Sequence, residues 1–126
     1  MKLHGPIPPG FAADADGMLR IGGQRADALA EAAGDTPLFV YDRAMLTARA
    51  AEWRAAMPGE VRLHYAMKAN PFAPLLAHMA AIVDGLDVAS GGELALALAS
   101  GMAGEHISFA GPGKRDRELE AAIAAG

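Results

Sequence analysis

The chain has 126 residues, 52% of them hydrophobic, and a formal net charge of −4. This length suits one small domain, and the apolar fraction is ample for a core. Acidic and basic residues are interspersed along the chain, which argues against binding to nucleic acid and against a polybasic membrane patch. There is no cysteine, and the four histidines lack the close spacing of metal ligands. Disulfides are therefore excluded, and we expect no metal site.

The hydropathy pattern gives no sign of membrane insertion. No stretch approaches the ~20 apolar residues of a membrane span. The Pro/Gly-rich start of the chain lacks the apolar run of a signal peptide. We therefore expect a cytoplasmic protein that does not associate with a membrane.

The first part of the chain predicts short elements separated by turns. Residues 18–21 form a possible strand, Gly22-Gly23 a turn, and residues 26–33 a short helix that ends at Gly34. The β-branched and aromatic run 38–41 predicts a strand. Asp42 then caps a helix over 43–57, in which Trp53 belongs to the apolar stripe and is expected in the core.

A lysine stands where the next strand meets a helix. Over residues 61–68 the apolar side chains fall on one parity, and Arg62, His64, Ala66 and Lys68 fall on the other. Lys68 thus ends one face of the strand. Asn70 is a suitable N-cap, and Pro71 suits the first helical position. In parallel α/β proteins this end of a strand is where ligands bind, although most lysines at such positions are simply solvated.

Two more strand and helix pairs follow. A helix ends near Gly85, a strand covers 86–89, and a capping box of Ser90 and Glu93 opens a helix that ends at Gly101. A strand over 106–110 precedes a helix that starts near residue 115. The inward-facing positions of this last helix are expected to be Leu119 and Ile123. This βαβαβ series predicts parallel strands in sequential order, either in a small doubly wound sheet or in part of a barrel.

Three ordered blocks resemble one known family. The string Tyr-Ala-Met-Lys-Ala-Asn-Pro, residues 65–71, resembles the cofactor-lysine motif of the fold type III pyridoxal phosphate enzymes, specifically the diaminopimelate and ornithine decarboxylase group. Residues 87–94, Asp-Val-Ala-Ser-Gly-Gly-Glu-Leu, and residues 107–114 with Glu118-Leu119 match in the same order. Residues 36–42 also resemble this group. The opening at residues 5–10 is faintly similar to the subgroup associated with bacterial exosortase (exopolysaccharide export) systems.

The resemblance implies a fold and a domain division. It implies a partial TIM (β/α)8 barrel of the alanine racemase-like kind, with residues 43–126 forming its first three βα units. Residues 1–42 would belong to a separate β domain. Because a complete barrel needs roughly 250 residues, the chain is expected to be an N-terminal fragment that is inactive alone. Its unclosed sheet edges are expected to cause self-association.

The resemblance also implies residue roles. Lys68 would be the Schiff-base lysine for pyridoxal 5'-phosphate in an amino-acid decarboxylase that is a homodimer at full length. Asp87 would be the acidic residue near the Schiff-base nitrogen, with Ala66 beneath the cofactor and Ser90 at its rim. Competing interpretations are a helix-dipole partner for Asp87 and a helix cap for Ser90. Lys114 is expected to be a solvated loop residue, since its surroundings do not form a Walker motif.

Two functional alternatives stay open at this point. An amino-acid racemase uses the same barrel, but its lysine motif is usually followed by a Tyr-Gly-His-Gly type run, whereas residues 71–74 here are Pro-Phe-Ala-Pro. A non-catalytic or vestigial domain that binds pyridoxal phosphate is the other. The substrate cannot be narrowed to one amino acid, because substrate choice depends on residues expected beyond Gly126.

Overall fold

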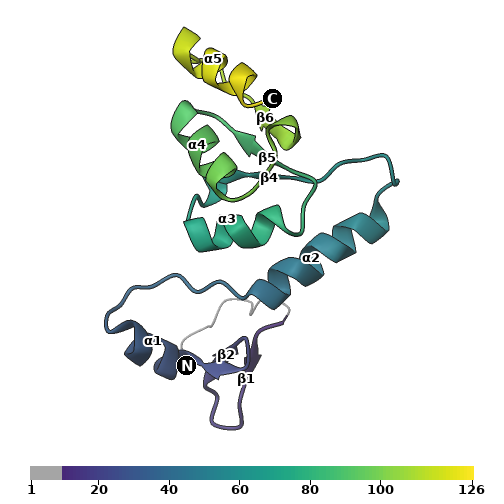
Figure 1. The fold of residues 1–126 in the computed structure, drawn as a ribbon. Coiled ribbons are helices and arrows are strands. Elements are labelled where there is room, and N and C mark those ends of the chain that lie inside the picture. Colours follow the sequence, from purple (N-terminus) through teal and green to yellow (C-terminus); the bar gives the residue numbers. More distant parts are fainter. Residues whose placement is uncertain (1–9) are drawn as a thin grey trace. The chain divides into compact units, whose positions relative to one another are not determined.

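The structure, a computed structural model, describes residues 10–126 and divides into two compact units, with the boundary in the sequence between Ala48 and Arg49. The first unit contains an antiparallel sheet with the order β1-β2-β3, made of Ala12–Ala13, Leu19–Ile21 and Gln24–Arg25 (Figure 1). Helix α1, Ala26–Ala33, follows directly and ends at Gly34, whose φ of 79° is left-handed. The predicted strand, turn and helix of this segment are confirmed, because their signals are local.

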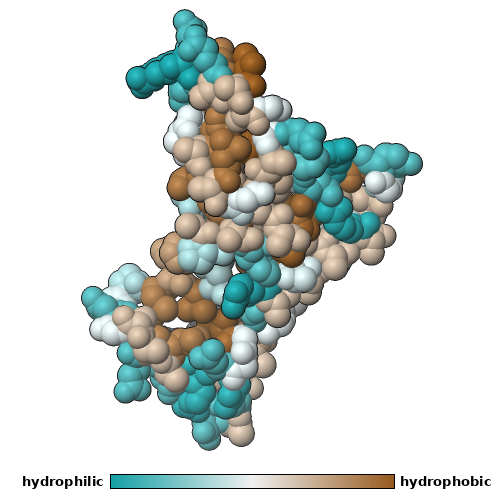
Figure 2. Space-filling model, in the orientation of Figure 1, coloured by the Kyte–Doolittle hydropathy of each residue, from teal (hydrophilic) through white to brown (hydrophobic). Residues whose placement is uncertain are grey.

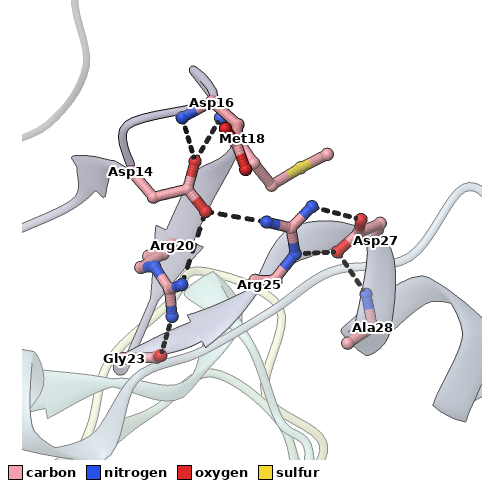
Figure 3. A network of polar contacts seen from close by, with 8 residues as sticks. All are labelled: Asp14, Asp16, Met18, Arg20, Gly23, Arg25, Asp27 and Ala28. Atoms are coloured by element: carbon pink, nitrogen blue, oxygen red, sulfur yellow. Dashed lines mark hydrogen bonds and ion pairs between the residues drawn. The ribbon is translucent and has the colours of Figure 1, made fainter.

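A polar network holds the small sheet together (Figure 3). The carboxylate of Asp14 accepts the backbone N–H of Met18 at 2.9 Å and pairs with Arg25 at 2.8 Å and Arg20 at 3.4 Å. Arg25 also pairs with Asp27 at 2.9 Å. The Met18 hydrogen bond is the largest of the effects that lower the pKa of Asp14. One carboxylate thus ties the β1–β2 connection to both following strands.

The strand predicted over residues 38–41 is wrong. The segment has no regular structure, and Phe39 is 91% exposed. A strand needs a hydrogen-bonded neighbour, and no strand between residues 10 and 126 pairs with this segment. The cap at Asp42 is confirmed, since its Oδ1 accepts the N–H of Ala44 at 2.8 Å and helix α2, Arg43–Ala56, begins there. Trp53 is 54% exposed on this helix and not in the core as predicted.

The second unit contains the parallel sheet. Its strands are β4, His64–Ala66, β5, Gly85–Val88, and β6, Ile107–Phe109, hydrogen-bonded in the order β4-β5-β6. Figure 1 shows the helices that follow them, which are α3, Ala73–Ala80, α4, Gly91–Ala99, and α5, Asp116–Ala124. Two 3-10 turns, η1, Met67–Ala69, and η2, Gly104–His106, flank the sheet in sequence. The predicted series of three βα units with parallel strands is confirmed.

The core lies between the sheet and helices α3 and α4. It consists of Met67, Leu76, Leu86, Val88, Leu94, Ala97 and Met102. Because successive strand residues point to opposite faces, the burial of Leu86 and Val88 places Asp87 on the other face of β5. Helix α5 contributes only Ala122 to this core. Leu119 and Ile123 are 41% and 80% exposed, so the prediction that they face inward is wrong, and the α5 residue that packs against the core is Ala122.

Asp84 joins three segments of the second unit. Its Oδ1 pairs with Arg54 of α2 at 2.8 Å, and its Oδ2 accepts the N–H of Leu63 at 2.7 Å. Its own N–H donates to the carbonyl of Leu63 at 2.8 Å. The Arg54 hydrogen bond, followed by the Leu63 N–H, lowers the pKa of Asp84 from 3.8 to about 2. A depressed carboxyl pKa stabilises the fold above the unfolded pKa, and this contribution is lost as pH falls toward the folded pKa.

We therefore expect Asp84→Asn to lower the melting temperature at neutral pH. The difference from the wild type should shrink as the pH falls from 3.8 to about 2, where Asp84 becomes protonated in the folded protein. Thermal unfolding followed by circular dichroism at several pH values measures this. Glu52→Gln is the control, because Glu52 forms only an exposed pair with Arg49 on α2. A gap that stays constant between pH 7 and about 2 would contradict the role of Asp84.

Apolar side chains remain at the surface. Figure 2 shows hydrophobic patches on both units. The large apolar side chains that are exposed include Phe39, Trp53, Phe72 and Ile123. In the described part of the chain, β4 and β6 each have one unpaired edge. The expected self-association stays a prediction. Between residues 10 and 126 there is no helix with the length and apolar character needed to span a membrane.

Candidate functional site

Lys68 lies in the turn after β4. The predicted strand to residue 68 is too long, because β4 ends at Ala66 and residues 67–69 form η1. Met67 is fully buried in the core, whereas Lys68 is exposed. The buried Met67 anchors the turn and leaves the neighbouring lysine outside the core. Between residues 10 and 126 no carboxylate pairs with the Lys68 amine.

The loop after the lysine is held by hydrogen bonds. The Tyr65 hydroxyl donates to the carbonyl of Asn70 at 3.1 Å, and Asn70 Oδ1 accepts the N–H of Phe72 at 2.9 Å. The prediction that Asn70 and Pro71 start the helix is therefore wrong. Helix α3 begins at Ala73, with Phe72 at the N-cap position. The Asn70 side chain closes an Asx turn instead, a common alternative to a cap for this residue type.

The sheet brings Ala66 and Asp87 together. The parallel register pairs Ala66 with Asp87, and Asp87 with Ser108. Turn η1, which carries Lys68, also contacts β5. The structure thus places the lysine turn, Ala66 and Asp87 at one end of two neighbouring strands, as the order of the predicted elements requires.

Ser108 and His64 lie on the same face of the sheet as Asp87, and the sequence analysis did not propose either of them as a site residue. Ser108 Oγ lies 2.8 Å from Asp87 Oδ1 and 3.3 Å from His64 Nδ1. His64 pairs with Gly85 across the strands, and a side chain at Gly85 would put its Cβ 2.5 Å from His64 Cε1. Glycine therefore makes room for the imidazole. His64 shares the strand parity of Ala66, which was a usable signal, but the position of Ser108 depends on the register.

The part of the chain that contains the parallel sheet matches a known family. The family model for the pyridoxal binding domain of pyridoxal-dependent decarboxylases matches residues 43–126, two thirds of the chain. The chain belongs to this family. Its membership confirms the resemblance to the fold type III decarboxylases and the partial barrel.

Individual relatives of the chain are amino-acid decarboxylases by name. Diaminopimelate decarboxylase of Neisseria meningitidis serogroup B is 40% identical over 99 residues, 78% of this chain and 24% of that protein. The structure of diaminopimelate decarboxylase from M. jannaschii with L-lysine superposes with a TM-score of 0.77 at 30% identity, covering 93% of this chain and 28% of that one. The structure of ornithine decarboxylase from Entamoeba histolytica superposes with a TM-score of 0.69 at 26% identity, covering 80% of this chain and 32% of that one. The chain spans about a quarter of the curated relative's length.

Ser90 acts as a helix cap in this decarboxylase-family chain. Its Oγ accepts the N–H of Glu93 at 3.2 Å, as the capping box predicts. The Glu93 carboxylate reaches one residue further back than expected and accepts the N–H of Ala89 at 2.7 Å. The N–H of Gly91 is bound by the Glu118 carboxylate at 2.7 Å, and this bond is the main cause that lowers the pKa of Glu118. The backbone N–H groups of Ala89, Gly91 and Glu93 at the start of α4 thus all donate to side chains of this chain.

We expect Ser90→Ala to reduce the free energy of unfolding by about 1 kcal/mol, the usual cost of losing a serine cap. Ser90→Asp is the matched control, because a carboxylate can accept the same N–H and favours a helix N-terminus. Urea denaturation of the two variants measures the difference. Equal losses in both variants would show that the hydroxyl does not act as a cap.

Lys114 lies in a loop, as predicted, but its side chain contacts other residues and is not simply solvated. Its Nζ donates to the carbonyl of Gly111 at 2.7 Å and lies 5.3 Å from the centroid of the Phe109 ring. The side chain therefore closes the turn after β6 and adds a cation–π contact. This local role leaves Lys68 as the lysine whose amine is free at the candidate site.

Proposed function

We propose that this chain is the part of a pyridoxal-phosphate-dependent amino-acid decarboxylase that carries the Schiff-base lysine, Lys68. The observation that supports this most is the state of that lysine. Its amine is exposed and unpaired, while the adjacent Met67 is buried and fixes the turn that carries it. A free amine held at the carboxyl end of a parallel strand can bond to an aldehyde.

The neighbouring residues fit the cofactor. Lys68 would hold it covalently, Ala66 has a side chain small enough to leave space beside it, and Asp87 offers a carboxylate to a cationic nitrogen on the same face. Pyridoxal phosphate, when bound, supplies an electron-accepting ring that makes loss of CO₂ from an amino acid feasible. The Lys68 amine would return a proton to the substrate carbon after release of CO₂.

Further parts of this proposal concern the whole protein. Residues 1–42 would belong to a β domain and residues 43–126 to the start of the barrel that binds the cofactor. Ser90 would lie at the cofactor rim while it caps α4. The protein would act on a small-molecule amino-acid substrate, as the names of its relatives suggest, and would work as a homodimer. A cytoplasmic location stays a prediction.

The test is release of CO₂ by the full-length protein. It would be loaded with pyridoxal phosphate and offered diaminopimelate, ornithine and arginine in turn. The proposal expects CO₂ release from at least one of these amino acids, with loss of that activity in Lys68→Ala. Racemisation without CO₂ release, or cofactor binding without turnover of any amino acid, would contradict it.

A further inference from the structure

The polar face of the parallel sheet carries two side chains that the proposed function does not use. Ser108 lies on β6 in register with Asp87, and His64 lies on β4 two residues before Ala66. The three polar groups form a chain across the three strands, from His64 Nδ1 to Ser108 Oγ at 3.3 Å and on to Asp87 Oδ1 at 2.8 Å. The space for the imidazole exists because Gly85 has no side chain.

The chemistry of these groups determines the direction of each hydrogen bond. An ionised carboxylate only accepts, so the single proton of the Ser108 hydroxyl goes to Asp87. The other acceptor near this hydroxyl is the carbonyl of Leu86, whose oxygen is farther from Ser108 Oγ, at 3.5 Å. Since the hydroxyl proton is used, the contact with His64 requires that Nδ1 carries a hydrogen and donates it to Oγ. Neutral His64 is then the Nδ1–H tautomer.

We propose that Ser108 and His64 are positioning residues for Asp87, acting as a relay in which His64 Nδ1–H orients the Ser108 hydroxyl and that hydroxyl holds Asp87 Oδ1. The relay keeps the carboxylate in one orientation and leaves Oδ2 for a cation on the face that carries Lys68. This inference rests on the proposed function for the role of Asp87. The hydrogen-bond pattern itself does not depend on that role.

The test reads the tautomer of His64 directly. The full chain is labelled with ¹⁵N-histidine and studied by long-range ¹H–¹⁵N NMR at about pH 8. His64→Gln assigns the signals. We expect His64 mainly as the Nδ1–H tautomer, although free histidine favours Nε2–H. Solid-state NMR of the same sample reads the same nitrogen shifts if the protein self-associates.

Variants test each link of the relay. Ser108→Ala should move His64 to the Nε2–H tautomer, and Ser108→Thr should restore Nδ1–H because it keeps the hydroxyl. Asp87→Ala frees the hydroxyl proton for Nδ1 and should also produce Nε2–H, which gives a second route if Ser108→Ala does not fold. Ser100→Ala is the control, since the Ser100 hydroxyl donates to Ala97 at the end of α4. The Nε2–H form in the wild type, or no change in both relay variants, would overturn the inference.

Turnover tests the positioning role separately. In the full-length decarboxylase, Ser108→Ala should lower kcat by about tenfold with KM little changed, as expected for loss of one hydrogen bond to a charged group. Ser108→Thr should recover most of it. An unchanged kcat would overturn the positioning role. Loss of cofactor labelling at Lys68 with the tautomer pattern intact would instead reject the proposed function, so the two failures are distinguishable.

Discussion

Replacing Lys68 with alanine is expected to abolish the covalent attachment of pyridoxal phosphate. In the proposed function, the amine of Lys68 bonds to the cofactor aldehyde, and alanine has no nucleophile with which to replace it. Visible absorption of the loaded full-length protein should disappear. Borohydride reduction followed by peptide mass spectrometry should find the cofactor on the peptide with Lys68 in the wild type and on no peptide in the variant. Decarboxylation should fall below detection.

Lys114→Ala is the matched control for this experiment. Lys114 donates to the Gly111 carbonyl and covers the Phe109 ring, so its removal should leave the labelling of Lys68 unchanged. The experiment measures covalent labelling at one residue. A circular dichroism spectrum like that of the wild type would show that the variant is folded, so that a general loss of stability does not explain a loss of labelling. Cofactor found on Lys114 or Lys2 and not on Lys68, in an active preparation, would refute the central assignment.

The second large effect is expected at Gly85. A Cβ there would meet the backbone carbonyl oxygen of His106 and would lie 2.5 Å from Cε1 of His64. Strand β5 is the central strand of the parallel sheet, and the His106 carbonyl belongs to the backbone segment that leads into the neighbouring strand β6. Because this oxygen is part of the backbone, it cannot swing away like the end of a flexible side chain. Overpacking of this kind costs about 1–3 kcal/mol, and more where the backbone must shift. We therefore expect Gly85→Ala to unfold at markedly lower urea concentration.

Gly59→Ala is the matched glycine control. Apart from Gly59 and its two chain neighbours, no residue has an atom within 4 Å of a Cβ built at Gly59. The change should therefore leave the unfolding free energy within about 0.5 kcal/mol of the wild type. The His64 tautomer provides a second measurement, since displacement of the imidazole in Gly85→Ala should break its contact with Ser108. Equal stability of the two alanine variants would show that the sheet accommodates the extra methyl group.

Much of the fold could be predicted from local sequence signals. Gly34 ends α1 and Asp42 begins α2 because a left-handed glycine and a capping carboxylate act within one helical turn. Ser90 starts α4 for the same reason. The alternation of strand and helix signals after residue 61 also predicted parallel strands, which the register confirms.

The errors arose where burial and pairing decide the structure. Residues 38–41 have the composition of a strand but no pairing partner in the described chain. Trp53 and Ile123 have apolar side chains at helical spacing, yet both are more than half exposed. Asn70 has the chemistry of a cap and closes a turn instead. Periodicity shows which side chains share a face, but it does not show what packs against that face.

The sequence by itself determined that Lys68 stands near the carboxyl end of one strand, that Asp87 lies in the next strand, and which family the motif around the lysine resembles. Only the tertiary structure decided that Lys68 leaves the strand in a turn anchored by buried Met67, and that Asp87 bonds to Ser108. The physical reason is that residues 21 positions apart become neighbours only through the register of parallel strands, which hydrogen bonds between strands establish.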